Sequence, residues 1–158
     1  MKQGLGTQLR HLIELLDGAV EASYAEAGLD YRPRYTPVMR ALAAVDALTI
    51  GEIAAQAGIT QPAATQTVAV MVKEGLLVTS AGKDARRKMV RLSEAGRAML
   101  PRLQQCWQAT ALATAGLDAQ LPHPLSGTLA SAIEALEEES FGARIRAARA
   151  GLAAQDPS

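Results

Sequence analysis

Positive charge is concentrated in one short stretch of this 158-residue chain. Five basic side chains fall within nine residues, namely Lys83, Arg86, Arg87, Lys88 and Arg91. Basic side chains at this density bind phosphate, and an arginine on a thin loop enters the narrow minor groove of DNA, where the negative potential attracts it. Asp84 lies among them and is too close to Arg86 to act as an independent anion. We therefore expect Asp84 to orient that guanidinium or to hold a turn.

The remainder of the chain balances this charge. Lys and Arg number 16, as do Asp and Glu, so the formal net charge is zero. Residues 32–102 nevertheless carry 11 basic and five acidic groups, a net charge of +6, whereas residues 1–31 and 103–158 each carry a net charge of −3. Phosphate binding requires a local cationic face and not a basic whole. Chance clustering on a solvated surface would give the same distribution, so charge favours nucleic acid without requiring it.

A group of small polar side chains precedes the basic stretch. It consists of Thr60, Gln61, Thr65 and Gln66, whose spacing places them on one side of a helix. A glutamine amide bonds the N6 and N7 atoms of adenine through two hydrogen bonds, and threonine reaches a base or a phosphate. The N-terminus of a helix adds backbone donors and a positive dipole. These four residues are therefore candidate readers of DNA bases.

Local signals predict the elements that would position these side chains. A helix should begin at its N-cap Thr49 and end at Gly58. The next helix should begin at its N-cap Thr60, tolerate Pro62 in its first turn and end at Gly75. Two helices joined by so tight a turn are typical of a helix-turn-helix, whose second helix enters the major groove of DNA.

Further helices and one strand pair are expected around this core. The strands are predicted at residues 76–80 and 88–92, with the basic stretch at the turn between them. Periodic apolar residues predict flanking helices at residues 5–27, 36–44, 94–115 and 126–150, the last with a possible break near Gly142. The helix at residues 36–44 should have Thr36 as its N-cap and turn Val38 and Val45 inward.

These pieces resemble the MarR family of bacterial transcriptional regulators. The similar segments are IAAQAGITQPAATQTV, the EGLL that follows it, and the run DARRKMVRLSEAGR. The wing of that family typically contains Asp, one residue, Arg, a valine strand ending in Leu-Thr, and a Gly. The corresponding positions here are Asp84, Arg86, Val90, Leu92, Ser93 and Gly96. The resemblance covers nearly the whole chain.

The resemblance implies a fold and a function. The fold would be mainly α with a small β-hairpin wing, in which a winged helix-turn-helix at residues 36–100 is flanked by dimerisation helices at 1–35 and 101–158, all in one structural domain. The function would be that of a ligand-responsive repressor, which binds an inverted repeat in double-stranded DNA as a homodimer. The recognition-helix residues would be Thr60, Gln61, Thr65 and Gln66, and the wing residues would be Lys83, Asp84, Arg86, Arg87 and Lys88.

The chain departs from the family pattern on the recognition helix. The family often has Arg or Lys where this chain has Gln61 and Gln66, and a large apolar residue where it has Thr67. Lys73, at the far end, is the only basic residue of this predicted helix. The wing would therefore supply most of the affinity for phosphate.

The resemblance also implies a dimer and an effector site. Six apolar residues of the terminal helices would be exposed in a monomer unless they pack within the chain, namely Leu5, Leu9, Leu12, Leu129, Ile133 and Leu136. Candidate contacts for a small aromatic or anionic effector are His11, Tyr24, Tyr31, Arg34, Tyr35 and Trp107. Alternatively these residues only pack between a helix and a loop, with Arg34 or Arg32 touching phosphate.

Other functional classes find little support. A single cysteine excludes an internal disulfide, and Cys106 in mid-helix is more typical of a small buried hydrophobe than of a redox switch. No metal-ligand spacing, cofactor motif, signal peptide or apolar run of membrane-spanning length is present, so we expect a cytoplasmic protein that is not an enzyme. Two alternatives remain: a winged-helix module that binds protein without sequence-specific DNA binding, and the dimerisation domain of an enzyme cut from a longer chain.

Overall fold

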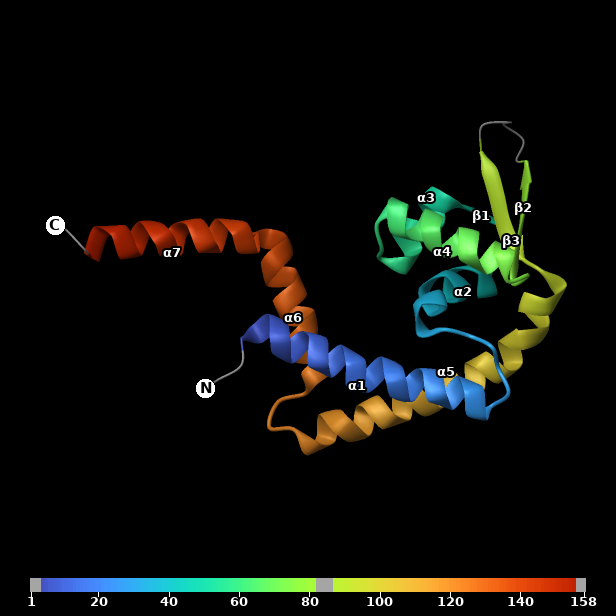
Figure 1. Cartoon of the computed structure of the whole chain (residues 1–158), viewed down its shortest axis with the longest axis horizontal. Coiled ribbons are helices and arrows are strands. Elements are labelled where there is room, and N and C mark those ends of the chain that lie inside the picture. The colour runs from blue at the N-terminus through green and yellow to red at the C-terminus, as the bar shows by residue number, and fades with distance from the viewer. Residues whose placement is uncertain (1–3, 82–86, 156–158) are drawn as a thin grey trace. The chain divides into compact units, whose positions relative to one another are not determined.

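The computed structural model describes residues 4–81 and 87–155 (Figure 1). These residues are mainly helical and contain one small antiparallel sheet, so the predicted fold class is confirmed. The chain divides into two compact units, residues 1–108 and residues 109–158, which we describe separately.

The first unit contains two long helices, the helix-turn-helix and the sheet. Its elements are α1 (Leu5–Glu26), the 3-10 turn η1 (Pro33–Tyr35), α2 (Thr36–Ala43), β1 (Leu48–Thr49), α3 (Ile50–Ala57), α4 (Gln61–Lys73), β2 (Leu77–Ala81), β3 (Lys88–Leu92) and the start of α5 (Glu94–Gln120). The second unit contains the end of α5, α6 (Leu125–Glu138) and α7 (Phe141–Gln155).

The sheet has three strands in the order β1-β3-β2, all antiparallel. The register of β2 and β3 runs from Leu77 opposite Leu92 to Ala81 opposite Lys88. The sequence predicted these two strands but not β1, which pairs with Val90 and Met89 of β3. A strand of two residues is too short to produce an alternating pattern, because its existence depends on its partner.

The helix-turn-helix forms as its local signals predict. At the start of α3 the Thr49 hydroxyl accepts from the Glu52 backbone N–H at 3.2 Å, while the Glu52 carboxylate accepts from the Thr49 backbone N–H at 2.8 Å, which completes a capping box. Gly58 ends α3 in the left-handed region, at φ 65°. The Thr60 hydroxyl caps α4 by accepting from the Ala63 N–H at 3.3 Å. The two helices are therefore fixed at three of their four ends by short-range contacts.

The core of the first unit joins α2, α3 and α4 to the sheet and to the start of α5. Its largest fully buried side chains are Tyr24, Tyr35, Met39, Leu42, Ile53, Met71, Leu77 and Leu103. Val38 is buried as predicted, but the prediction for Val45 is wrong, because α2 ends at Ala43 and Val45 is exposed. Once the helix has ended, helical spacing no longer determines which way a side chain points.

The prediction that Thr36 caps α2 is also wrong. The turn η1 leads directly into α2, so that Tyr35 already has helical backbone angles and stands at the N-cap. The Thr36 hydroxyl instead accepts from the Tyr31 hydroxyl at 3.2 Å and lies 3.4 Å from the Tyr24 hydroxyl. Thr36 thus ties a tyrosine cluster to the start of α2.

A tight junction joins α4, the sheet and α5. The Ser93 hydroxyl donates to the Gly75 carbonyl at 2.5 Å and accepts from the Gly96 N–H at 3.0 Å, and the Ser93 N–H donates to the Leu76 carbonyl at 3.0 Å. Gly96 is buried against the Leu76 carbonyl, where a β-carbon would clash. The end of the recognition helix, both long strands and α5 are therefore held in one fixed arrangement.

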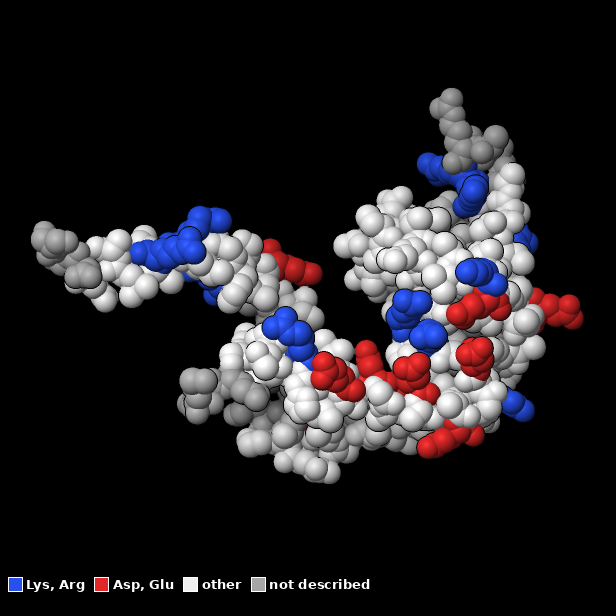
Figure 2. Space-filling model, viewed as in Figure 1, with Lys and Arg blue, Asp and Glu red and all other residues white. Residues whose placement is uncertain are grey.

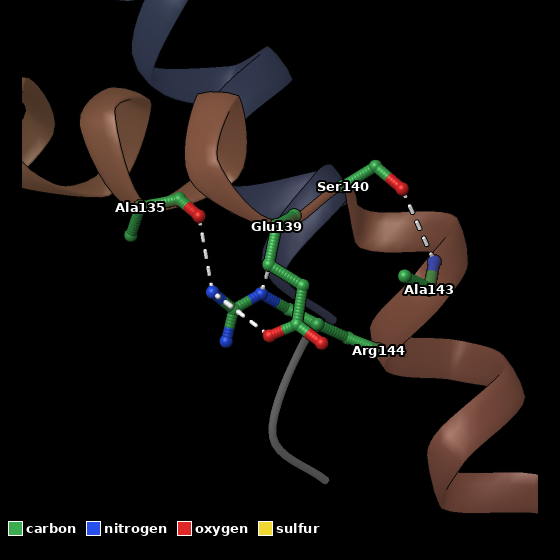
Figure 3. A network of polar contacts seen from close by, with 5 residues as sticks. All are labelled: Ala135, Glu139, Ser140, Ala143 and Arg144. Carbon is green, nitrogen blue, oxygen red and sulfur yellow. Dashed lines mark hydrogen bonds and ion pairs between the residues drawn. The ribbon is translucent and has the colours of Figure 1, made fainter.

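The second unit is built from helix corners. Asp118 of α5 accepts from the backbone N–H and the hydroxyl of Ser126 and so fixes the start of α6. Figure 3 shows the next corner, where Arg144 bridges the Ala135 carbonyl, at 3.0 Å, and the Glu139 carboxylate, at 3.5 Å, while the Ser140 hydroxyl caps α7 by accepting from Ala143. The predicted helix at residues 126–150 is therefore two helices, and the break lies before Gly142.

Candidate nucleic-acid interface

The exposed side of α4 presents the predicted base-reading side chains. Ala64, Val68 and Met71 are buried, which turns the opposite side of the helix outward. Thr60, Gln61, Thr65 and Gln66 are all exposed there. The hydroxyls of Thr60 and Thr65 already make local hydrogen bonds, to the Ala63 N–H and to the Gln61 carbonyl, so the two glutamines are the residues with the most bonding capacity on this side.

The turn end of the strand pair presents cations. Arg87 and Lys88 are exposed at the start of β3, and Figure 2 shows Lys and Arg side chains gathered at this end of the β2–β3 pair. The predicted wing residues Lys83, Asp84 and Arg86 lie outside the described residues. Their placement remains a prediction.

A hollow joins the start of the recognition helix to the turn end of the wing strands. Its volume is about 620 Å³, and its described lining consists of Thr49, Ile50, Gly51, Glu52, Gln61, Arg87 and Lys88. It brings together three residues that the sequence nominated from different elements: Gln61 at the start of α4, and Arg87 and Lys88 at the start of β3. An amide predicted to read bases and two cations predicted to bind phosphate therefore share one concave surface.

Glu52 is the unpredicted member of this hollow. Hydrogen bonds from the backbone N–H and the hydroxyl of Thr49 lower the pKa of the Glu52 carboxyl, and the nearby Arg87 guanidinium lowers it further. The carboxylate is therefore negative at neutral pH beside two cations. The spacing Thr49-x-x-Glu52 is that of a capping box and was the available signal for this residue.

Three of the predicted effector residues form a packed aromatic cluster. The rings of Tyr24 and Tyr31 meet edge to face at 4.8 Å between centroids, and those of Tyr31 and Tyr35 do so at 5.6 Å. All three side chains are buried. Burial raises the pKa of Tyr31 above its ordinary value, and burial, together with the negative charge of Glu74, raises that of Tyr35. These tyrosines are thus core residues: the hydroxyls of Tyr24 and Tyr31 meet Thr36, and the buried Tyr35 hydroxyl has no hydrogen-bond partner among the described residues.

The other predicted effector residues are dispersed. Arg34 lies over the Tyr35 ring at 5.5 Å, and Trp107 of α5 packs under Arg40 of α2 at 4.9 Å. His11 is exposed on α1 beside Glu14 and precedes Tyr24 by 13 residues, about 20 Å along a helix. A single small molecule therefore cannot touch both His11 and the tyrosine cluster. Arg40 was not predicted, and it also lines a hollow of about 430 Å³ with Thr36, Pro37, Ala41, Gln56 and Ala57.

Solved structures with the same fold are transcriptional regulators. MOSR of M. tuberculosis, solved in complex with DNA, is 23% identical, with a TM-score of 0.68 over 88% of this chain and 100% of that chain. A MarR family regulator of Silicibacter pomeroyi is 26% identical, with a TM-score of 0.60 over 84% and 94%. BpsR of Bordetella bronchiseptica, whose DNA binding is regulated by 6-hydroxynicotinic acid, is 21% identical, with a TM-score of 0.53 over 68% and 79%. No curated protein matches the chain in sequence.

A sequence comparison points to the same family for the helix-turn-helix segment. The family model described as the MarR family matches residues 28–87, the segment that contains α2, α3, α4 and most of the hollow's lining. This match and the shared fold support a MarR family winged-helix segment in this chain. The MarR family comprises transcriptional regulators and not enzymes.

The remaining features of the described residues are Cys106, the side chains that could bind a metal ion and the apolar character of the helices. Cys106 is half-buried against the core of the first unit. Within residues 4–81 and 87–155, no three His, Cys, Asp or Glu side chains are placed to hold a metal ion. None of the helices in the described parts of the chain is long and apolar enough to cross a membrane.

Proposed function

We propose that this protein is a DNA-binding transcriptional regulator that reads double-stranded DNA with α4 and holds it with the wing. The hollow that places Gln61 beside Arg87 and Lys88 carries this proposal. With α4 in the major groove, these two cations lie where the adjacent phosphates would pass. The recognition residues would be Thr60, Gln61, Thr65 and Gln66, and Lys83, Asp84 and Arg86 would complete the wing. Such a regulator acts in the cytoplasm, where its DNA lies.

We further propose that the protein acts as a homodimer on an inverted repeat. Support comes from apolar side chains left uncovered on helices in each unit: Leu5 of α1 is 65% exposed and Ile133 of α6 is 58% exposed. Patches of this kind mark interaction surfaces on soluble proteins. A two-fold dimer would present its recognition helices to half-sites about 34 Å apart. Sedimentation at low micromolar concentration should give twice the 16.6 kDa chain mass, and a monomer alone would contradict the dimer.

Regulation by a small aromatic or anionic molecule, with repression released on binding, is the third part of the proposal. A structural relative whose DNA binding is regulated by 6-hydroxynicotinic acid supports it. Of the six candidate residues, Trp107 and Tyr35 are the best placed to bind, because the Trp107 indole N–H and the Tyr35 hydroxyl are buried without a hydrogen-bond partner in the described part of the chain. Such a donor would bond a carbonyl or carboxylate. Titration of hydroxylated aromatic acids, followed by Trp107 fluorescence and operator release, tests this part.

Genomic selection of bound fragments, followed by footprinting, tests the central proposal. The expected result is one inverted repeat, bound with a steep loss of affinity as salt rises, with a log–log slope of about −0.9 per phosphate neutralised. Binding without sequence preference would contradict the proposal and favour a protein-interaction module. The footprint should cover both half-sites, because each recognition helix reads one.

A further inference from the structure

The hollow at the proposed DNA interface contains an acid as well as cations. Glu52 lines the same concave surface as Arg87, Lys88 and Gln61. A phosphate that approaches the two cations through this hollow therefore also approaches a carboxylate. A carboxylate repels a phosphate that comes near it, so Glu52 is expected to lower the affinity for DNA.

The carboxylate is held in place. Glu52 Oε2 accepts from the Thr49 backbone N–H at 2.8 Å and from the Thr49 hydroxyl at 3.1 Å, so it cannot swing away without breaking the capping box. The same hydrogen bonds, and Arg87 after them, keep the pKa of Glu52 below its ordinary value. Protonation at neutral pH therefore does not remove the charge.

We propose that Glu52 limits the affinity of this protein for DNA by competing with a backbone phosphate for Arg87. Glu52 is thus an affinity-setting residue, and the inference rests on the proposed function. Glu52 and Arg87, both among the described residues, line one hollow without forming an ion pair, so the carboxylate acts through its charge: it attracts the Arg87 guanidinium and repels a phosphate that approaches it. The penalty falls on every DNA sequence alike, since the phosphate backbone is the same in each.

The charge of Glu52 is not needed for the local fold. A glutamine amide oxygen accepts the same backbone hydrogen bond, and glutamine is the usual substitute for glutamate in capping boxes. The substitution Glu52→Gln therefore removes the charge and retains the cap. This makes it possible to separate the effect on affinity from the effect on folding.

The test measures binding of wild type and E52Q to the selected operator and to a scrambled duplex, over a range of salt concentrations. E52Q should bind both duplexes roughly three- to tenfold more tightly at low salt. Its log–log salt slope should be steeper by up to about 0.9, because Arg87 then neutralises a phosphate more fully. The ratio between operator and scrambled duplex should not change.

Two further variants control for charge and for mechanism. Glu21→Gln on α1 makes the same change in net charge but does not line the hollow, so it should bind like wild type. In an Arg87→Ala background, E52Q should produce a smaller gain than in wild type, because the residue for which Glu52 competes is gone. Stoichiometric titration with operator fixes the active concentration of each variant, so a change in folding does not distort the affinities.

The outcomes separate the inference from the proposed function. If wild type prefers no DNA sequence, the proposed function fails. If wild type binds its operator but E52Q matches E21Q, or binds more weakly, the role of Glu52 is contradicted and the proposed function stands. An E52Q gain of equal size in the Arg87→Ala background would contradict competition for Arg87.

Discussion

The recognition helix and the turn end of the wing carry different kinds of side chain on the proposed DNA-binding surface. The exposed side of α4 carries neutral amides and hydroxyls, with Lys73 alone at its far end, whereas the start of β3 carries Arg87 and Lys88 side by side. Neutral amides discriminate bases but release few counterions, and cations bind phosphate without reading sequence. We infer that α4 discriminates between base sequences and that the wing supplies affinity for the phosphate backbone, and the two elements meet in one hollow. Each of the following predictions tests that separation.

The largest effect on stability and DNA binding is expected at the junction that joins α4 to the wing. Gly96→Ala places a methyl group against the Leu76 carbonyl, at the junction of α4, the sheet and α5. Overpacking of this kind costs about 1–3 kcal/mol, so the melting temperature should fall and both base preference and affinity should decline together. Gly116→Ala, in an open part of α5, is the matched control and should stabilise the protein by about 0.5–1 kcal/mol. Equal stability of the two variants would contradict the tight junction.

Loss of a wing cation should weaken binding to all sequences. Arg87→Ala removes a charge-assisted contact worth about 2 kcal/mol, and Arg86→Ala should have at least as large an effect if that residue enters the minor groove. Anisotropy titrations should give weaker binding to operator and scrambled duplex alike, with a salt slope shallower by about 0.9. Arg97→Ala, at the start of α5, is a control outside the hollow. A loss confined to the operator would place Arg87 among the base readers.

Loss of a recognition-helix amide should relax sequence preference at one position. Gln61→Ala or Gln66→Ala should cost about 1–3 kcal/mol on the preferred base pair and little on its alternatives, if the amide bonds the base through two hydrogen bonds. Competition assays with single-base operator variants measure this. An unchanged preference in both variants would show that another surface reads the DNA.

The smallest effect is expected for the pH dependence of stability that comes from Glu52 in the capping box of α3. The pKa of folded Glu52 lies below its ordinary value of 4.5, so the charged carboxylate stabilises the fold at pH values above 4.5, and this contribution is lost as the pH falls through the folded-state value. The melting temperature of wild type should therefore fall slightly more steeply between pH 7 and pH 3 than that of E52Q. Parallel curves would mean that the capping charge does not contribute.

Local signals in the sequence predicted most of the fold. Thr49, Gly58 and Thr60 stand where they were expected, because caps and left-handed turns depend on residues within one helical turn. Val45 and Thr36 were misplaced because the exact ends of α2 depend on the turn η1 that precedes it and on packing around it. Strand β1 forms only by pairing with β3, so no local sequence pattern predicts it.

The candidate site was predicted in its residues but not in its arrangement. Gln61 and Arg87 are 26 positions apart in the sequence, and only the folded sheet brings them to one hollow. Glu52 was visible as a capping residue, but its proximity to the cations depends on how β3 lies against the start of α3. The charged residues can be counted in a sequence, but which of them lie close together is determined by the tertiary structure.

One measurement tests the central claim most directly: the salt dependence and the base preference of Gln61→Ala and Arg87→Ala, determined side by side on the same operator. The account predicts that Gln61→Ala alters preference at an unchanged salt slope, and that Arg87→Ala lowers the slope by about 0.9 at an unchanged preference. If both variants change only the base preference, or both change only the salt slope, then base discrimination and phosphate binding are not divided between α4 and the wing.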